Sequence, residues 1–330
     1  MKVFRPMLFT TLKHYSKEQF AKDVVSGIIV AIIALPLSIA LALASGVGPE
    51  QGLYTAIIAG FLISFFGGST VQIAGPTAAF ATIVAGIVAT SGMSGLIVAT
   101  LMAGVLLILM GIFHFGSLIK FIPYTITTGF TAGIAVTILI GQLKDFAGIA
   151  YEHGEKPVET MEKLQAFAGN IGTINWMAVL VGVICLAILI IWPYINKTIP
   201  GSLIAVLAGI VIVKVSGMHV NTIGDLYTIS NKLPSFTLPQ ISFGLVKEQF
   251  SNALVIAVLA AIESLLSCVV ADGMVNSKHR SNTELIAQGI GNMGSALFGG
   301  IPATGAIART AANIKSGGRT PVAGMVHALT

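Results

Sequence analysis

Long apolar stretches separated by short polar turns dominate this chain, and their length is the first clue to its fold. A helix needs about 20 apolar residues to cross a bilayer, and many such runs follow one another here. The apolar–polar alternation of a membrane β-barrel is not visible in the sequence. The pattern therefore predicts an all-α integral membrane protein with about ten to eleven spans.

The expected spans are the apolar runs between charged, proline-containing or glycine-rich turns. Pro36 is expected to interrupt the first of them. Two longer polar stretches, 141–173 and 216–248, are expected to be loops. In chain order the predicted spans are Val24–Ser45, Gly52–Phe66, Pro76–Thr90, Leu96–Phe113, Pro123–Ile140, Trp176–Tyr194, Ser202–Val215, Asn252–Ala271, Glu284–Phe298 and Ala308–Lys315, and an eleventh starts at Pro321.

Two segments in apolar surroundings contain glycines that forbid a continuous helix. Phe66-Gly67-Gly68 matches Phe298-Gly299-Gly300, and an extended piece follows each, 69–75 and 301–307. Non-helical backbone at membrane depth has to be buried in protein or line a polar cavity, and a helix that starts there attracts anions. The sequence thus predicts two half-helices preceded by short extended segments, which is typical of a transporter binding site. Two glycine-rich connectors between ordinary spans are the alternative.

The composition excludes a soluble domain. Hydrophobic residues make up 55% of the chain and charged residues 9%, with a mean hydropathy of +0.91, whereas soluble domains carry about 25% charged residues. The net charge of +5 does not indicate nucleic-acid binding, because the cations are spread over loops. Cys185 and Cys268 lie in apolar runs without metal-binding spacing, so we expect no metal and no cofactor. Enzyme motifs such as HExxH, GxSxG and the P-loop do not occur in the sequence, so we expect no enzyme.

The positions of lysine and arginine predict the orientation. With residues 1–22 in the cytoplasm, eleven of the 18 Lys and Arg residues fall inside and six outside, while Arg309 lies in a span. The two glycine segments are then seven spans apart and enter the membrane from opposite sides. This predicts a 7+7 inverted repeat whose second half is incomplete, so we expect a fragment of a longer fold.

Glu263 and Arg309 are the ionisable residues that stand out within the apolar runs. A carboxylate at the position of Glu263 has to be protonated, paired or bound to a cation, and a protonated form is what proton coupling requires. Arg309 is a permanent cation near a helix start and suits an anion site. A structural ion pair between the two is the alternative to both roles.

Hydroxyl groups around the two half-helices are further candidates. Thr77 and Thr304 flank the proposed cavity, Ser38 follows Pro36, and Ser267 shares a helix face with Glu263. The alternative for each is a hydrogen bond to its own helix backbone. A loop cluster of four residues, Asp272, Lys278, His279 and Arg280, is expected to be solvated.

Taken together, the motifs resemble the SulP anion transporters, the sulfate permease family. The resemblance covers nearly the whole chain. It rests on Leu35-Pro36, Gly48-Pro49-Glu50-Gln51-Gly52-Leu53-Tyr54, Phe66-Gly67-Gly68 through Gly75-Pro76-Thr77, Ile122-Pro123-Tyr124-Thr125 with Gly129-Phe130, Glu263-Ser264-Leu265-Leu266 with Val270-Ala271-Asp272, Glu284-Leu285 with Gln288-Gly289 and Gly291-Asn292, and Ala308-Arg309-Thr310 to Pro321.

The resemblance implies a fourteen-span fold in which a core domain moves against a gate domain like an elevator. Here the core would comprise 23–116 and 250–330 and the gate 117–249, and the last three spans and a cytoplasmic STAS domain are absent from the sequence. The resemblance also implies a homodimer in the bacterial inner membrane. Carried over residue by residue, it implies an anion site at Leu37, Leu41, Thr77, Ala306, Ile307 and Arg309, with Glu263 as the coupling residue.

The resulting hypothesis is a secondary transporter that imports sulfate, or next a C4-dicarboxylate, together with a proton. Sodium-coupled bicarbonate members tend to have an aspartate at the position of Glu263 and a threonine at that of Ile307, which argues against sodium coupling here. A bicarbonate transporter, an uncoupled anion channel or exchanger, and a non-transporting fragment remain alternatives. A nucleobase permease is disfavoured because its tenth span normally carries an acid where this chain has Arg309.

Overall fold

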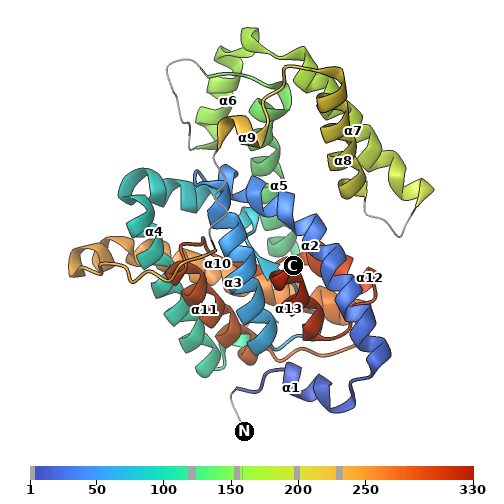
Figure 1. Cartoon of the computed structure of the whole chain (residues 1–330). Coiled ribbons are helices and arrows are strands. Elements are labelled where there is room, and N and C mark those ends of the chain that lie inside the picture. The colour runs from blue at the N-terminus through green and yellow to red at the C-terminus, as the bar shows by residue number, and fades with distance from the viewer. Residues whose placement is uncertain (1–3, 118–123, 152–156, 158, 197–200, 228–232) are drawn as a thin grey trace. The chain divides into compact units, whose positions relative to one another are not determined.

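The computed structural model describes residues 4–117, 124–151, 157, 159–196, 201–227 and 233–330 (Figure 1). Nearly all regular structure in this part is helical. The helices are α1 (Leu8–Thr11), α2 (Lys17–Ala44), α3 (Pro49–Phe66), α4 (Ala81–Ile112), α5 (Tyr124–Ala147), α6 (Thr160–Gly169), α7 (Trp176–Ile195), α8 (Gly201–Ser216), α9 (Ile223–Leu226), α10 (Phe243–Val275), α11 (Ser281–Leu297), α12 (Ile307–Lys315) and α13 (Pro321–Leu329), with 3₁₀ turns η1 (Leu12–His14), η2 (Ala78–Phe80) and η5 (Ile171–Thr173) and two strands, β1 (Ala74–Gly75) and β2 (Thr304–Gly305).

The chain forms two compact units. One contains residues 1–124 and 230–330, and the other contains 125–229. In the second unit, α7 packs against α8. The predicted roles of a moving core and a gate stay predictions. The start of the fifth expected span, with the Ile122-Pro123 motif, lies outside the described residues. So do five of the cations used for the orientation: Lys2, Lys120, Lys156, Lys197 and Lys232.

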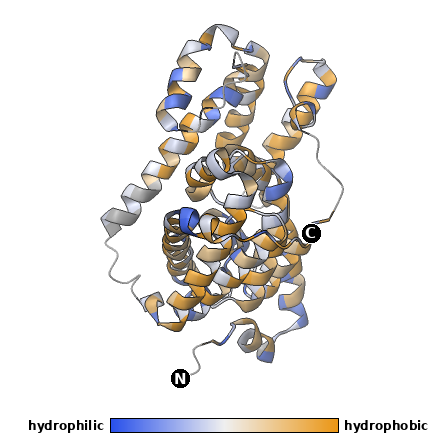
Figure 2. Ribbon diagram, turned by 90° about the vertical axis from the view of Figure 1, so that its left-hand side faces the viewer, coloured by the Kyte–Doolittle hydropathy of each residue, from blue (hydrophilic) through white to orange (hydrophobic). Residues whose placement is uncertain are grey.

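The first unit is a bundle built on small apolar side chains. α11 packs between α3 and α4, α10 lies against α4, and α13 packs against α2 and α3. Its core includes Ala257, Ala260 and Ala261 of α10, whose small size lets neighbouring helices approach closely. Hydrophobic residues dominate the long helices in Figure 2. Four helical stretches of the described part, Lys17–Ala44, Ala78–Ile112, Trp176–Ile195 and Phe243–Val275, are long and apolar enough to cross a membrane, while the total number of spans stays a prediction.

The two glycine segments take the expected extended form. β1 and β2 pair antiparallel, with Ala74 opposite Gly305 and Gly75 opposite Thr304. Helical structure starts three residues after β1, at η2, and two residues after β2, at α12. The expected half-helices with preceding extended segments are therefore present.

Several expected boundaries differ from the structure. α2 runs through Pro36 without a break, so the expected interruption of the first span is wrong. By contrast, the expected break between the third and fourth spans is present as a kink within α4 at the non-helical residue Gly92, whose φ of 62° suits glycine because it has no Cβ. α6 and α9 lie within the stretches expected as loops. Some helices also start outside the apolar runs, because a polar side chain caps their first turn. The side chain of Ser242, for example, accepts from Leu245 N at the start of α10.

Candidate functional site

The paired strands form the frame of the candidate site. The extended backbone before α12 is tied to that before η2, because Ala306 N donates to Ile73 O over 2.8 Å. On the other side of Ile73, its N–H donates to Thr310 Oγ1 of α12 over 3.0 Å. Two helix starts, whose free N–H groups favour negative charge, are thereby held next to one strand pair.

Arg309, in the first turn of α12, lies inside this frame. Its side chain is only 2% exposed, and its Nη2 donates to Pro76 O over 2.7 Å. Nη1 and Nε have no hydrogen-bond partner among the described residues. Gly75 leaves room for the guanidinium, since a Cβ there would lie 2.5 Å from Nη1. Arg309 thus offers two unpaired donors and a permanent positive charge in a buried place.

Glu263 of α10 faces the start of the other half-helix. Its Oε2 accepts a hydrogen bond of 2.9 Å from Thr77 Oγ1, and Thr77 immediately precedes η2. Glu263 and Arg309 do not form an ion pair within 4.0 Å, since the ion pairs in the described part are Lys22–Glu18 and His279–Asp272. The closed structural pair considered as an alternative is therefore not the arrangement seen.

The other predicted residues of the two half-helices have mixed surroundings. Thr304 is fully buried and donates to Ala260 O over 3.1 Å, which ties β2 to α10. Ser267 Oγ lies 3.4 Å from Thr310 Oγ1. Ala306 caps α12 and is 9% exposed, whereas Ile307 is 37% exposed. Thr304 and Ser267 therefore make contacts that can be purely structural.

The predicted residues of α2 stand apart from this hydrogen-bonding frame. Leu37 is 39% exposed and Leu41 is 9% exposed. Ser38 is fully buried, and its Oγ has no partner among the described residues. No hydrogen bond joins Ser38 to Arg309 or Glu263 in the described part, so the role of these three residues stays a prediction.

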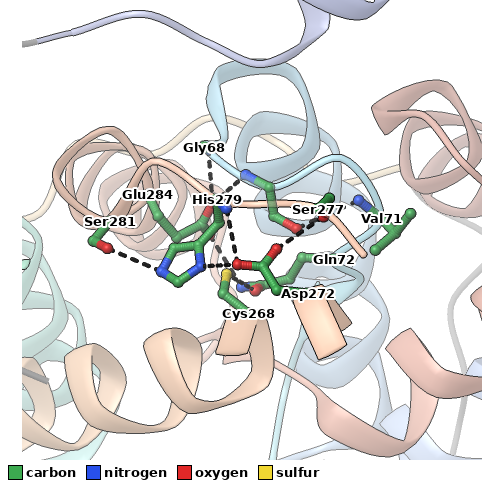
Figure 3. Close-up of polar contacts among 10 residues, drawn as sticks. Gly68, Val71, Gln72, Cys268, Asp272, Ser277, His279, Ser281 and Glu284 are labelled. Carbon is green, nitrogen blue, oxygen red and sulfur yellow. Dashed lines mark hydrogen bonds and ion pairs between the residues drawn. The ribbon is translucent and has the colours of Figure 1, made fainter. Parts of the chain in front are cut away.

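Glu284 of α11 is a functional candidate that the sequence reasoning passed over. It is fully buried, and its carboxylate accepts hydrogen bonds both from backbone N–H groups of the first extended segment and from neighbouring side chains (Figure 3). The donors are Gly68 N at 2.8 Å, Ser69 N at 3.2 Å, Gln72 Nε2 at 3.0 Å, Ser264 Oγ at 3.4 Å and Gln288 Nε2 at 2.9 Å. Glu284 therefore holds the beginning of the first extended segment in place.

Gln72 extends this network towards α10. Its Nε2 also donates to Ser264 Oγ over 2.9 Å, and Cys268 Sγ contacts its Oε1. Although Cys268 lies in an apolar run of the sequence, its thiol joins a polar network in the structure. A periodic signal could have revealed this face: Glu284, Gln288 and Asn292 recur at every fourth position of an apolar helix.

The second extended segment has a matching anchor on the same helix. The amide of Asn292 accepts from Ala303 N and donates to Ala303 O, both at 2.9 Å. Thr55 Oγ1 of α3 accepts from Ile301 N over 2.7 Å. One face of α11 thus holds both extended segments.

The loop between α10 and α11 is more buried than expected. His279 Nδ1 lies 2.7 Å from Asp272 Oδ2, with side chains 7% and 17% exposed, and His279 Nε2 lies 2.9 Å from Ser281 Oγ (Figure 3). Arg280 is also engaged, donating through Nη1 to Arg5 O. The prediction of a solvated cluster is therefore wrong for Asp272 and His279, whose pairing shields both side chains from solvent. Arg280 is half-buried, and Lys278 is exposed as expected.

Comparison with known proteins identifies relatives along nearly the full chain. The model of the sulfate permease family matches residues 20–330. The putative sulfate transporter YvdB of Bacillus subtilis (strain 168) is 47% identical over 317 residues, which are 96% of this chain and 59% of that protein. The bicarbonate transporter BicA of Picosynechococcus sp. is 34% identical over 319 residues, 93% of this chain and 55% of that protein. The chain thus spans little more than half the length of these relatives.

Solved structures share the fold. The transmembrane domain of a cyanobacterium bicarbonate transporter BicA matches with a TM-score of 0.84 and 31% identity, over 96% of this chain and 81% of that chain. SLC26A9 matches with a TM-score of 0.82 at 19% identity, over 98% of this chain and 55% of that one, which shows the fold alone. The expected all-α membrane fold and the family resemblance are confirmed. On the family match and the 47% identity, the chain belongs to the sulfate permease family.

Proposed function

We propose that this chain forms the membrane part of a secondary active transporter that carries a small anion together with a proton. Sulfate is the first candidate substrate and a C4-dicarboxylate the next. The observation that carries the proposal is Arg309, a 2%-exposed cation with two unpaired donor atoms beside two helix starts. Buried charges are normally paired, so this one calls for a counter-ion, and a transported anion supplies it.

Glu263 is the proton-carrying group in this proposal. It has one hydrogen-bond donor, Thr77, and no ion pair with Arg309 within the described part. A carboxylate in apolar surroundings with so little support gains stability when a proton binds. Anion binding next to Glu263 would favour its protonation further, because a second negative charge repels the carboxylate, and this links anion uptake to proton uptake.

The experiment is uptake into proteoliposomes by the full-length gene product. Labelled sulfate and labelled succinate are compared with and without an inward proton gradient for the wild type, Glu263→Gln and Arg309→Gln. We expect gradient-driven uptake of one anion. Each variant should lower it at least about tenfold, which corresponds to ~1.4 kcal/mol in the barrier.

Glu18→Gln is the matched control, because it makes the same chemical change on an exposed carboxylate whose pairing with Lys22 is worth little. It should transport like the wild type. Uptake that ignores the gradient and survives Glu263→Gln would reject proton coupling. Uptake that survives Arg309→Gln would reject the anion site.

Bicarbonate is the second candidate, favoured by the 34% identity to the bicarbonate transporter BicA. Ile307 weighs against sodium-coupled bicarbonate transport, since its side chain cannot ligate a cation. A parallel uptake assay with labelled bicarbonate, with and without sodium, separates the candidates. Sodium-dependent bicarbonate uptake without sulfate uptake would replace the first proposal.

The proposal includes the wider arrangement expected for such a transporter. The unit of 1–124 and 230–330, which carries Glu263 and Arg309, would move the substrate in an elevator-type cycle. The full-length protein would assemble as a homodimer in the cell membrane with its N-terminus in the cytoplasm. Cross-linking in membranes and accessibility of a cysteine placed at Lys13 test these two points.

A further inference from the structure

The N-terminal segment, residues 4–20, is fastened to the end of the bundle although it precedes the first long helix. Met7 N donates to Gly67 O over 2.8 Å, and Arg5 N donates to Thr283 Oγ1 over 3.3 Å. Arg280 also holds the segment, because its Nη1 donates to Arg5 O over 2.9 Å and its Nη2 donates to Thr10 Oγ1 over 3.0 Å. The segment is thus built into the fold.

The C-terminal end of this segment is fixed by the buried carboxylate of Asp23. Asp23 is fully buried and accepts from Tyr15 Oη at 2.9 Å, from Gln19 Nε2 at 2.9 Å and from Thr320 Oγ1 at 2.5 Å. Burial, with the hydrogen bond to Asp23 as the next cause, raises the pKa of Tyr15 to about 12. The phenol is thus a neutral donor at physiological pH, and its hydrogen bond ties Tyr15 to the start of α2.

The segment has one face turned inward and one turned outward. Met7 and Leu8 are 8% and 4% exposed, whereas Phe9, Leu12 and Phe20 are 54%, 44% and 52% exposed. Phe9 packs edge-on against Phe65 and Phe20 against Tyr15, yet about half of each of the three side chains stays exposed, and exposed apolar groups gathered in this way mark an interaction surface. α1 lies at the end of the bundle where α2 begins (Figure 1).

The outward face continues a surface of α2 that is apolar along its length. Val25, Ile28, Ile32 and Leu35 are all exposed and recur at helical spacing, as expected for side chains that face lipid. Beside the apolar residues of the segment lie exposed Lys13 and Lys17. Aromatic side chains with flanking lysines, next to a lipid-facing helix, match the chemistry of an anionic membrane surface.

We propose that residues 4–20 bind the headgroup layer of anionic phospholipids, with Phe9, Leu12 and Phe20 inserted and Lys13 and Lys17 paired with lipid phosphate. The segment is bonded to Gly67, and Gly68 N in turn is held by Glu284. Contact with anionic lipid therefore bears on the first extended segment and, through it, on the frame of the candidate site.

A bimane fluorophore on Phe9→Cys tests where the segment lies. The full-length protein is reconstituted in phosphatidylcholine alone or with an equal part of phosphatidylglycerol, each brominated on its acyl chains. We expect blue-shifted emission that is quenched about twofold more strongly in the anionic vesicles, because each lysine near a charged surface contributes roughly 1 kcal/mol. Wild type treated with the same reagent gives the background from Cys185 and Cys268.

The lysine contribution is tested in the double variant Lys13→Gln/Lys17→Gln. It should lose the difference between the two lipids, whereas Lys247→Gln, an exposed lysine of α10, should keep it. Water-like, unquenched emission would overturn the proposal. So would blue-shifted but unquenched emission, which would mean that a second copy or another protein domain covers Phe9, and so would equal quenching in both lipids.

Uptake assays form a separate arm that rests on the proposed function. Anion uptake should increase about twofold or more with phosphatidylglycerol in the wild type and less in the double variant. If no anion uptake is found at all, the proposed function fails while the fluorescence result still decides where the segment binds. If uptake is robust but insensitive to phosphatidylglycerol, the coupling between segment and site is rejected.

Discussion

Two carboxylates on neighbouring apolar helices, Glu263 of α10 and Glu284 of α11, have very different surroundings. Within the described part, Glu263 accepts one hydrogen bond, from Thr77, whereas Glu284 accepts five. Many donors stabilise a carboxylate as an anion, while a carboxylate with one donor loses little when it is protonated. The same residue type thus holds an extended segment in one place and is the proposed proton carrier in the other.

The extended segments and the candidate site residues also differ in how many hydrogen bonds fix them. In the first extended segment, Gly68, Ser69 and Gln72 donate hydrogen bonds to Glu284. In the second, Ala303 is hydrogen-bonded to Asn292. In contrast, Arg309, in the first turn of α12, and Glu263 of α10, which faces the start of η2, have few partners. A rigid frame around under-paired functional groups is what a preorganised binding site requires.

The largest expected effect is on stability, in Glu284→Gln. The amide nitrogen of glutamine cannot accept a hydrogen bond, so two or three of the five donors to Glu284 lose their acceptor, at about 1–3 kcal/mol for each buried group left unsatisfied. Unfolding of the purified protein in mixed micelles measures this loss. The matched variant Glu263→Gln should change stability by less than about 1 kcal/mol. Equal losses in the two variants would remove the distinction between the carboxylates.

A somewhat smaller loss is expected for Asn292→Leu. Leucine is close in volume but leaves Ala303 N and O unpaired in a buried place, at about 1–3 kcal/mol for each unsatisfied group. The same unfolding assay applies, with Asn252→Leu as the control. Within the described part of the chain, the Asn252 side chain donates a hydrogen bond only to the side chain of Gln249. Unchanged stability would mean that the second extended segment does not depend on α11.

The smallest expected effect is that of Thr77→Val on Glu263. The variant removes one hydrogen bond, so stability should fall by only about 1 kcal/mol. Gradient-driven uptake should shift in its pH dependence, because Glu263 loses its hydrogen-bond support as an anion. Thr77→Ser keeps the hydroxyl and should behave like the wild type. An unshifted pH profile in Thr77→Val would separate Thr77 from proton coupling.

The sequence predicted the all-α membrane fold and the two extended segments, and it singled out Glu263 and Arg309, whose roles stay a prediction. These follow from local properties: hydropathy marks membrane helices, glycine forbids a continuous helix, and a charge within an apolar run has few structural explanations. The start of α13 at Pro321 was equally readable, because proline favours the first helical position.

What the sequence could not decide is which polar groups meet. The pairing of Gly75 with Thr304, the bond from Arg309 to Pro76 O and four of the five donors to Glu284 join residues more than 190 positions apart or residues on different helices. Asp272 and His279 looked like a solvated loop until packing buried them. Composition and periodicity describe each segment alone, and only tertiary structure determines which buried donor finds an acceptor and which, like Nε and Nη1 of Arg309, finds none among the described residues.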